Sequence, residues 1–179
     1  MSSRAKLNSR YRIATVERFE EPLFTQLSST VFGDQARARA LLELAQPVEL
    51  SQPTMLRIGA FENDTLVGWT YGWFERSGTY YMANSAVLPE HRRKGIYSAL
   101  VRRAVEAAAE RGTSVVRSRH VAANNAVLIA KLKLGFVITG SEFSEEFGLL
   151  IRLSYFCDDA RRQLFCDRAG PITDIAGDG

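Results

Sequence analysis

The segment that decides the fold reads Ala86-Val-Leu-Pro-Glu-His-Arg-Arg-Lys-Gly-Ile-Tyr-Ser98. Pro89 cannot take part in a ladder of strand hydrogen bonds, so the strand before it ends there. Gly95 allows the tight bend that turns the chain into a helix. The first N–H groups of a helix have no internal acceptor, and the helix dipole favours negative charge near them. The segment is therefore a strand, a turn and a helix that together predict an anion site.

Three consecutive cations surround this predicted helix start. Arg92, Arg93 and Lys94 lie directly before Gly95, which makes a diphosphate the natural occupant. The chain as a whole carries a net charge of only +3, too little to argue for nucleic acid by itself. From the residues alone a second interpretation stays open, namely a basic turn that only begins a surface helix.

Outward from this segment, the spacing of apolar residues alternates between that of strands and that of helices. A helix that links one strand to a parallel neighbour gives an α/β or α+β domain with helices on the faces of its sheet. The predicted strands are 10–16, 55–61, 66–75, 79–87, 114–120, 136–143 and 147–156. The predicted helices are two within 22–45, separated at Gly33, then 95–111 and a short helix that Asn124 or Asn125 caps. Bulky side chains would share one face of strand 66–75, namely Val67, Trp69, Tyr71 and Trp73.

The length and composition indicate one globular domain. A chain of 179 residues with 46% hydrophobic residues can bury a core of its own. We place that domain at 10–157, after a flexible leader at 1–9 and before a C-terminal tail at 158–179 that we expect to be partly disordered. No apolar run approaches the roughly 20 residues of a membrane span, and no secretory signal is visible. The predictions are therefore a cytoplasmic protein and no membrane partner.

The deciding segment resembles the acetyl-CoA-binding motif of the GNAT superfamily of N-acetyltransferases. That motif is written [Q/R]-x-x-G-x-[G/A] and follows a strand that ends in Val-x-Pro. Val87 and Pro89 match the end of the strand, and Arg92 and Gly95 match the first and fourth motif positions. A second family segment is matched in part by Asn124, Lys133, Gly135 and Phe136. The order of elements agrees from about residue 10 to residue 156.

The resemblance implies both a fold and a reaction. The fold would be a mixed sheet of about seven strands, mostly antiparallel with one splayed parallel pair, and helices on both faces. The reaction would move an acetyl group from acetyl-CoA, as co-substrate, to the primary amine of a small molecule or peptide by direct attack in a ternary complex. The family's habits suggest a homodimer, and no metal is expected. The residues assigned to acetyl-CoA are Ser85, Ala86, Val87, Arg92, Arg93, Lys94, Gly95, Ile96, Tyr97, Ser98, Asn124 and Lys131.

Two residues depart from the family pattern. Tyr97 replaces the last small residue of the motif, so its ring must lean away from the diphosphate or cover part of the cofactor. Lys131 stands where the family usually has the Tyr thought to protonate the departing CoA thiolate. Two roles are open for Lys131. It shares a helix face with Asn124 and can point at the cofactor as a proton donor, or its ammonium extends from an apolar helix into solvent.

The amine must lose a proton before it attacks, so we expect a base. His120 lies at the end of the second splayed strand and titrates in a useful range, although an ordinary surface histidine is the alternative. Glu75, Asn84 and Tyr155 are rival groups.

Two other functions also remain open. The departures at Tyr97 and Lys131 allow an inactive acyl-CoA-binding regulatory module. The arginine-rich helix and strand allow a nucleic-acid-binding domain, which is disfavoured because no nucleic-acid motif is present.

Overall fold

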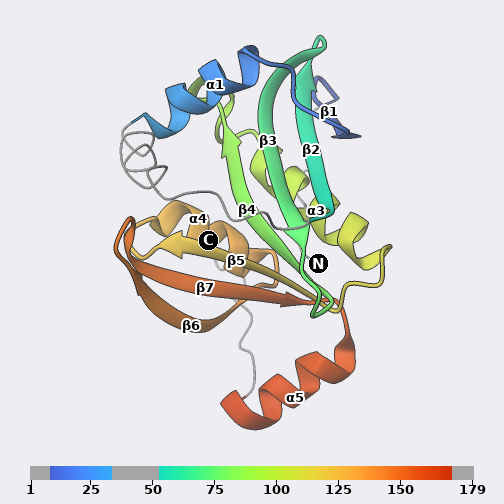
Figure 1. Ribbon diagram of the computed structural model, residues 1–179, viewed down its shortest axis with the longest axis vertical. Coiled ribbons are helices and arrows are strands. Elements are labelled where there is room, and N and C mark those ends of the chain that lie inside the picture. Colours follow the sequence, from blue (N-terminus) through green and yellow to red (C-terminus); the bar gives the residue numbers. More distant parts are fainter. Residues whose placement is uncertain (1–8, 34–52, 171–179) are drawn as a thin grey trace.

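Seven strands form one mixed sheet in the computed structural model, which describes residues 9–33 and 53–170 (Figure 1). Their spatial order is β1-β2-β3-β4-β5-β7-β6. Only β4 and β5 pair in parallel, and every other neighbouring pair is antiparallel. The predicted sheet is therefore confirmed. The strands are β1 Arg12–Val16, β2 Met55–Glu62, β3 Thr65–Phe74, β4 Thr79–Val87, β5 Val115–Val121, β6 Val137–Ser144 and β7 Gly148–Phe156.

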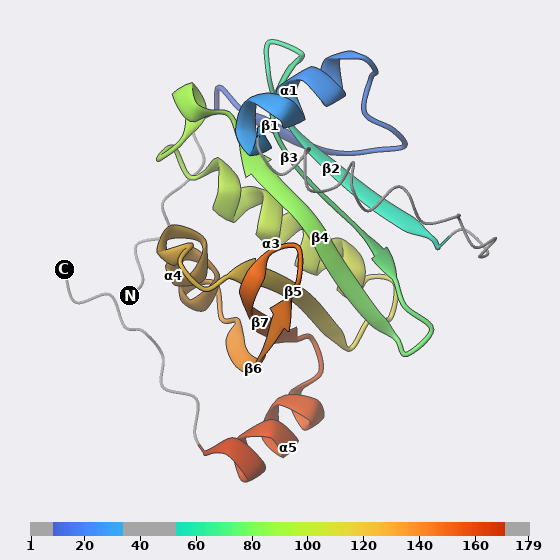
Figure 2. The same ribbon diagram turned by 60° about the vertical axis from the view of Figure 1, so that its left-hand side comes forward.

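Helices cover both faces of this sheet, as expected. Figures 1 and 2 show α1 across one face and α3 behind the other. The second helix predicted within 22–45 falls on residues outside the described part of the chain. The helices are α1 Leu23–Phe32, α3 Ile96–Ala109, α4 Asn125–Lys133 and α5 Asp159–Ala169, with a short 3₁₀ turn η1 at Pro89–His91. No helix within the described ranges is both long enough and apolar enough to cross a bilayer.

Each face of the sheet has its own apolar core. On the side of α3, buried residues of the strands pack against Ile96, Leu100 and other residues of that helix. On the side of α1, a smaller cluster centred on the fully buried Trp69 packs against Phe24 and its neighbours. We call these the α3-side core and the α1-side core. The larger α3-side core fixes β4 and α3 against each other, and these two elements carry the predicted anion site.

The prediction that Val67 shares a face with Trp69 is wrong. The β2–β3 register shifts between Ala60 and Phe61, which leaves Val67 as an extra residue opposite β2. Such a bulge puts two successive side chains out of the usual alternation. Val67 therefore joins the α3-side core while Trp69 joins the α1-side core.

Helix α5 was not predicted from the sequence. Asp158 caps it, because its side chain accepts a hydrogen bond from the backbone N–H of Arg161 at 3.1 Å. Phe165 packs against Phe156 of β7, with ring centroids 5.4 Å apart. None of the helix residues is buried, so the sequence carried little apolar periodicity to indicate a helix. The domain limits given above remain a prediction.

Candidate active site

The two parallel strands β4 and β5 part after a short stretch of pairing. Their register covers only Thr79–Tyr81 against Val115–Arg117. Beyond these pairs β4 rises beside β3 while β5 turns away toward β7 (Figure 1). We call the point where the strands part the fork. On the far side of the fork, residues 82–87 of β4 have no pairing with β5, which leaves backbone groups on that edge for a ligand.

A bulge in β4 lies directly at the fork. Tyr71 pairs with Asn84 and Gly72 pairs with Met82, so Ala83 is the extra residue. A bulge bends its strand and increases the local twist. The local geometry of β4 therefore explains why it separates from β5 at this point.

Among the described residues, the loop from η1 to α3 has backbone N–H groups near the end of β4 with no hydrogen-bond partner. Arg93 and Gly95 both have left-handed backbone conformations, with φ of 63° and 79°. The backbone N–H of Ala99 donates to the carbonyl of Gly95 at 3.0 Å, which is the first hydrogen bond of the helix. The N–H groups of Ile96, Tyr97 and Ser98 therefore have no acceptor within the helix. Successive N–H groups in such a turn form a concavity for an anion. A Cβ at Gly95 would meet no atom within 4 Å, so the space in front of the loop is open.

The cations of the loop are exposed, and two of them also brace it. Arg92 Nε donates to the carbonyl of Val87 at 3.1 Å, and Lys94 Nζ donates to the carbonyl of Glu90 at 2.8 Å. The first bond ties the loop to the end of β4, and the second ties it to η1. Together with Arg93, the two side chains surround the N–H groups with positive charge, and the set fits a diphosphate.

Tyr97 points into the protein. Its ring packs against the α3-side core, and burial raises the pKa of its hydroxyl. The buried oxygen has no hydrogen-bond partner among the described residues. The ring therefore turns toward the core and away from the predicted anion site, which is the first of the two orientations that the sequence allowed.

Lys131 is fully buried at the fork, with 0% of its surface exposed. Its Nζ lies 3.0 Å from Met82 Sδ on β4 and 3.0 Å from Ser118 Oγ on β5. These are the first residues beyond the last parallel pair, so the amine bridges the two strands where they part. It also lies 4.3 Å from the ring centroid of Phe136. The alternative in which Lys131 extends into solvent is therefore wrong.

Burial changes the acid–base properties of this amine. It lowers the pKa of Lys131 from 10.5 to about 7, because a charged ammonium loses its hydration there. A group with a pKa near neutrality can both hold and release a proton at working pH.

His120 is part of the same polar cluster. Its Nε2 lies 3.1 Å from Ser118 Oγ, the atom that also contacts Lys131. Burial, with a smaller effect from the charge of Lys131, lowers the pKa of His120 from 6.5 to about 3. His120 is thus a partly buried, neutral imidazole rather than an ordinary surface histidine. The expectation that it titrates in a useful range is wrong, because burial holds its pKa well below neutrality. Ser118 could not be singled out from the sequence, because one serine in an alternating strand carries no signal until its neighbours in space are known.

The remaining predicted residues fall into two groups. Ser85, Ala86 and Val87 follow the fork along β4 and lead into the loop that holds residues 92–98. The hydroxyl of Ser85 is 2.8 Å from that of Thr70, its partner on β3, so both side chains lie on the same face of the sheet. Asn124 caps α4, because its Oδ1 accepts from the N–H of Val127 at 3.3 Å.

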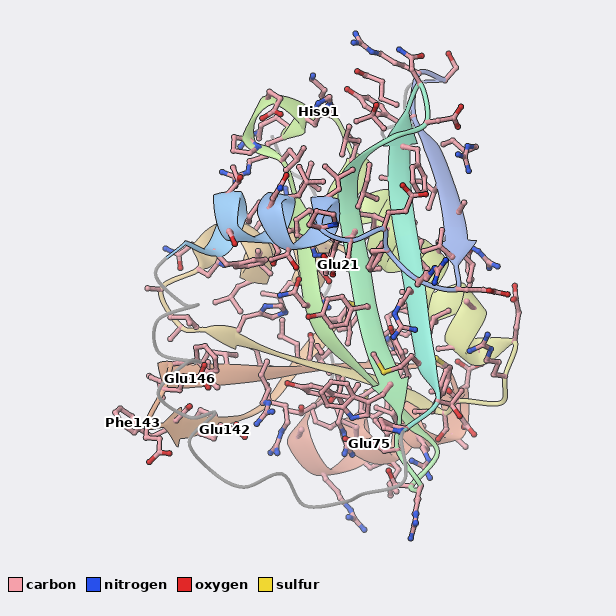
Figure 3. All side chains as sticks on the ribbon, turned by 45° about the horizontal axis from the view of Figure 1, so that its top comes forward. Glu21, Glu75, His91, Glu142, Phe143 and Glu146 are labelled. Atoms are coloured by element: carbon pink, nitrogen blue, oxygen red, sulfur yellow. The ribbon has the colours of Figure 1, made fainter. Side chains whose placement is uncertain are left out.

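The rival groups make other contacts than His120 does. Figure 3 shows Glu75 and His91 at opposite ends of the sheet, and Glu75 lies at the closed end of the β3–β4 turn. Asn84 Oδ1 accepts a hydrogen bond from Trp69 Nε1 at 2.8 Å. Tyr155 packs against Phe136, with ring centroids 5.4 Å apart.

Solved structures share this architecture. The chain is similar to an IAA acetyltransferase from Bacillus cereus, with 20% identity, 82% of this chain and 99% of that chain covered, and a TM-score of 0.62. It is similar to a Bacillus subtilis acetyltransferase in complex with CoA, with 19% identity, coverage of 83% and 99%, and a TM-score of 0.60. A Bacillus anthracis protein in complex with acetyl coenzyme A matches with 19% identity, coverage of 64% and 71%, and a TM-score of 0.55. Because each of these identities is 20% or lower, the similarity establishes a shared fold and nothing further.

Comparison at the level of sequence gives the family. No curated protein matches the chain. A model of the acetyltransferase (GNAT) family matches residues 16–136, a range that includes the fork, the loop, α3 and α4. The chain therefore belongs to the acetyltransferase (GNAT) family.

Proposed function

We propose that this protein is an N-acetyltransferase that moves an acetyl group from acetyl-CoA to a primary amine by direct attack in a ternary complex. The observation that carries the proposal is the continuous path from the fork to the loop. Residues 82–87 of β4 are unpaired toward β5, and they lead directly to the first N–H groups of α3 and to the exposed cations before it. One strand thus connects an anion site with an acid–base cluster.

The loop residues would hold the diphosphate. The N–H groups that begin α3 supply hydrogen-bond donors, and Arg92, Arg93 and Lys94 supply charge. The free edge of β4 at Ser85–Val87 would hold the pantetheine arm through backbone hydrogen bonds, and its N–H groups would stabilise negative charge on the acyl oxygen.

Acid–base chemistry would take place at the fork. Acetyl-CoA, when bound, supplies an acetyl thioester and leaves as a thiol. His120 would take a proton from the acceptor amine, and Lys131 would release a proton toward the departing sulfur. A large part of the rate enhancement would come from holding the amine and the thioester together.

A matched pair of substitutions tests the loop. Gly95→Asp and Gly95→Asn differ only in charge, both add a side chain that tolerates a left-handed backbone, and neither meets protein atoms at Cβ. In calorimetric titration with acetyl-CoA, we expect Gly95→Asp to bind at least about tenfold more weakly than Gly95→Asn, because a carboxylate would face the diphosphate. Equal affinity of the two variants for acetyl-CoA would show that the loop is not part of the binding site.

Turnover separates the enzyme from an inactive acyl-CoA-binding module. Release of free CoA would be followed over a panel of amines, from small polyamines and amino-acid derivatives to peptides. Acetyl-CoA binding together with turnover on one amine class supports the enzyme. Binding without turnover on any amine would favour the regulatory module instead.

A further inference from the structure

One buried hydroxyl joins the two groups to which the proposed function gives acid–base roles. Ser118 Oγ lies 3.0 Å from Lys131 Nζ and 3.1 Å from His120 Nε2. Ser118 and Lys131 both have 0% of their surface exposed, so water has no direct access to this junction in the structure. His120, which is partly exposed, is the member of the cluster nearest to solvent.

A hydroxyl can donate and accept a hydrogen bond at once, so it can pass a proton between its two neighbours. The other groups that face Lys131 Nζ offer no such path. Within the described ranges they are the thioether of Met82 on β4 and the ring of Phe136 after α4. His120 on β5 is a titratable group whose pKa the charge of Lys131 lowers, as a smaller effect beside burial.

We propose that Ser118 is a positioning residue that relays the proton of the acceptor amine from His120 to Lys131. This inference rests on the proposed acetyl transfer. In the starting state, His120 carries its proton on Nε2 and Lys131 is neutral. Nδ1 of His120 accepts the amine proton, the Nε2 proton moves to Ser118 Oγ, and the hydroxyl proton of Ser118 moves to Lys131 Nζ.

The relay balances protons without an added reactant. The amine nitrogen forms the new bond to the acetyl carbon, the carbon–sulfur bond breaks, and Lys131 releases its proton to the leaving sulfur. Lys131 is then neutral again, and His120 returns to its starting tautomer by exchange with water. The direction follows from affinity for the proton, because Lys131 has a pKa of about 7 and His120 one of about 3.

The relay predicts a specific dependence on pH. Above about pH 7 the amine of Lys131 is neutral, so it needs the relayed proton for each turnover. Without the hydroxyl of Ser118, Lys131 must take that proton from solvent. The fraction of molecules in which Lys131 is already protonated falls as pH rises. The defect should therefore grow with pH, whereas a loss of packing would have no such dependence.

The experiment compares kcat of the wild type with that of Ser118→Ala from pH 6 to pH 9, with Ser118→Thr as the variant that keeps a hydroxyl. Because the acceptor amine titrates identically in both reactions, its titration cancels when the kcat of the wild type is divided by that of the variant. For Ser118→Ala we expect a ratio that rises to roughly 10- to 100-fold at the upper end, and for Ser118→Thr a ratio that stays flat. A flat ratio for Ser118→Ala would overturn the relay.

A second readout needs no substrate. The chain has two histidines, and ¹⁵N NMR of the unliganded protein follows both. Ser118→Ala should shift the Nε2 signal of His120 and leave that of His91 unchanged, because His91 contacts Tyr11 instead. An unchanged His120 signal would show that the hydrogen bond is absent and would overturn the relay.

The two proposals fail in different ways. A wild-type protein that binds acetyl-CoA but acetylates no amine would contradict the proposed acetyl transfer, and the relay that rests on it. A wild type that turns over while Ser118→Ala gives a flat ratio would remove only the relay.

Discussion

Lys131 combines two properties that oppose each other at the scale of a single residue. It carries an ionisable amine, and it has no exposed surface. Within the described ranges its hydrogen-bond partners are a hydroxyl and a thioether, neither of which offsets a full charge. Burial of such a group lowers the stability of the folded state, so its presence at the fork is more easily explained by chemistry than by packing.

We predict that Lys131→Met stabilises the protein while it lowers turnover. Methionine fills a similar volume and needs no proton. The folded pKa of Lys131 is about 7 against 10.5 unfolded, so the unfolded chain binds more protons between these values and wild-type stability rises with pH there. The gain from Lys131→Met should be on the order of a few kcal/mol below pH 7 and should shrink toward pH 10.

Urea unfolding at pH 6 and pH 9 measures this gain. Lys133→Met is the matched control, since it changes an exposed lysine on the same helix, and its effect should stay within about 0.5 kcal/mol at both values. A destabilised Lys131→Met protein at pH 6 would show that the contacts of the amine stabilise the folded state by more than the burial of its charge destabilises it.

The sequence identified position 131 but not its environment. Apolar residues surround Lys131 on its helix, among them Leu128 and Leu132, and a long amphipathic side chain in such a helix usually reaches for solvent. Which way it turns depends on the space between β4 and β5, and that space arises from strand pairing far away in the sequence. Ser118 was missed for the same reason.

At the scale of elements, the separation of β4 from β5 depends on a close approach between β3 and β4. A Cβ at Gly72 would lie 2.0 Å from the carbonyl oxygen of Tyr81 and 2.9 Å from Cα of Met82. Real Cβ atoms do not tolerate such contacts with backbone, so glycine is required opposite the bulge. Both Tyr81 and Met82 border the fork.

Gly72→Ala should therefore destabilise the protein by at least about 3 kcal/mol, because β3 or the bulge must move. Gly78→Ala in the neighbouring turn is the control. Its Cβ meets nothing within 4 Å although φ is +74°, so backbone strain alone should cost about 1 kcal/mol. Thermal or urea unfolding measures both, and equal losses would mean that the close approach relaxes freely.

Local sequence patterns predicted most strands and helices, but they could not predict the irregular pairing between strands. Alternation located β3 and β4, but the bulges at Val67 and Ala83 arise from pairing with a partner strand and leave no mark in composition. Helix α5 was missed because none of its residues is buried, which leaves little apolar periodicity in its sequence. The turn from β4 through η1 into α3 was predictable because Pro89 and Gly95 act locally on the backbone.

At the scale of the whole molecule, buried contacts are unevenly distributed. Helix α3 buries residues along most of its length, whereas α1 and α5 bury none. Local opening follows such differences. We therefore expect hydrogen exchange to be slowest in α3 and in the central strands β2 to β4, and fast in α1 and α5.

Acetyl-CoA should change this pattern only where the proposed site lies. A ligand at about 100 times its dissociation constant stabilises the bound conformation by about 2.7 kcal/mol, which slows local exchange roughly 100-fold. In exchange measured by mass spectrometry with and without acetyl-CoA, we expect added protection in residues 82–98, from the unpaired part of β4 into α3. Helix α5 and the tip of the β6–β7 hairpin, where Phe143 is 81% exposed, serve as internal controls. Protection spread evenly over the chain, or confined to the hairpin, would place the cofactor somewhere other than the fork and its loop.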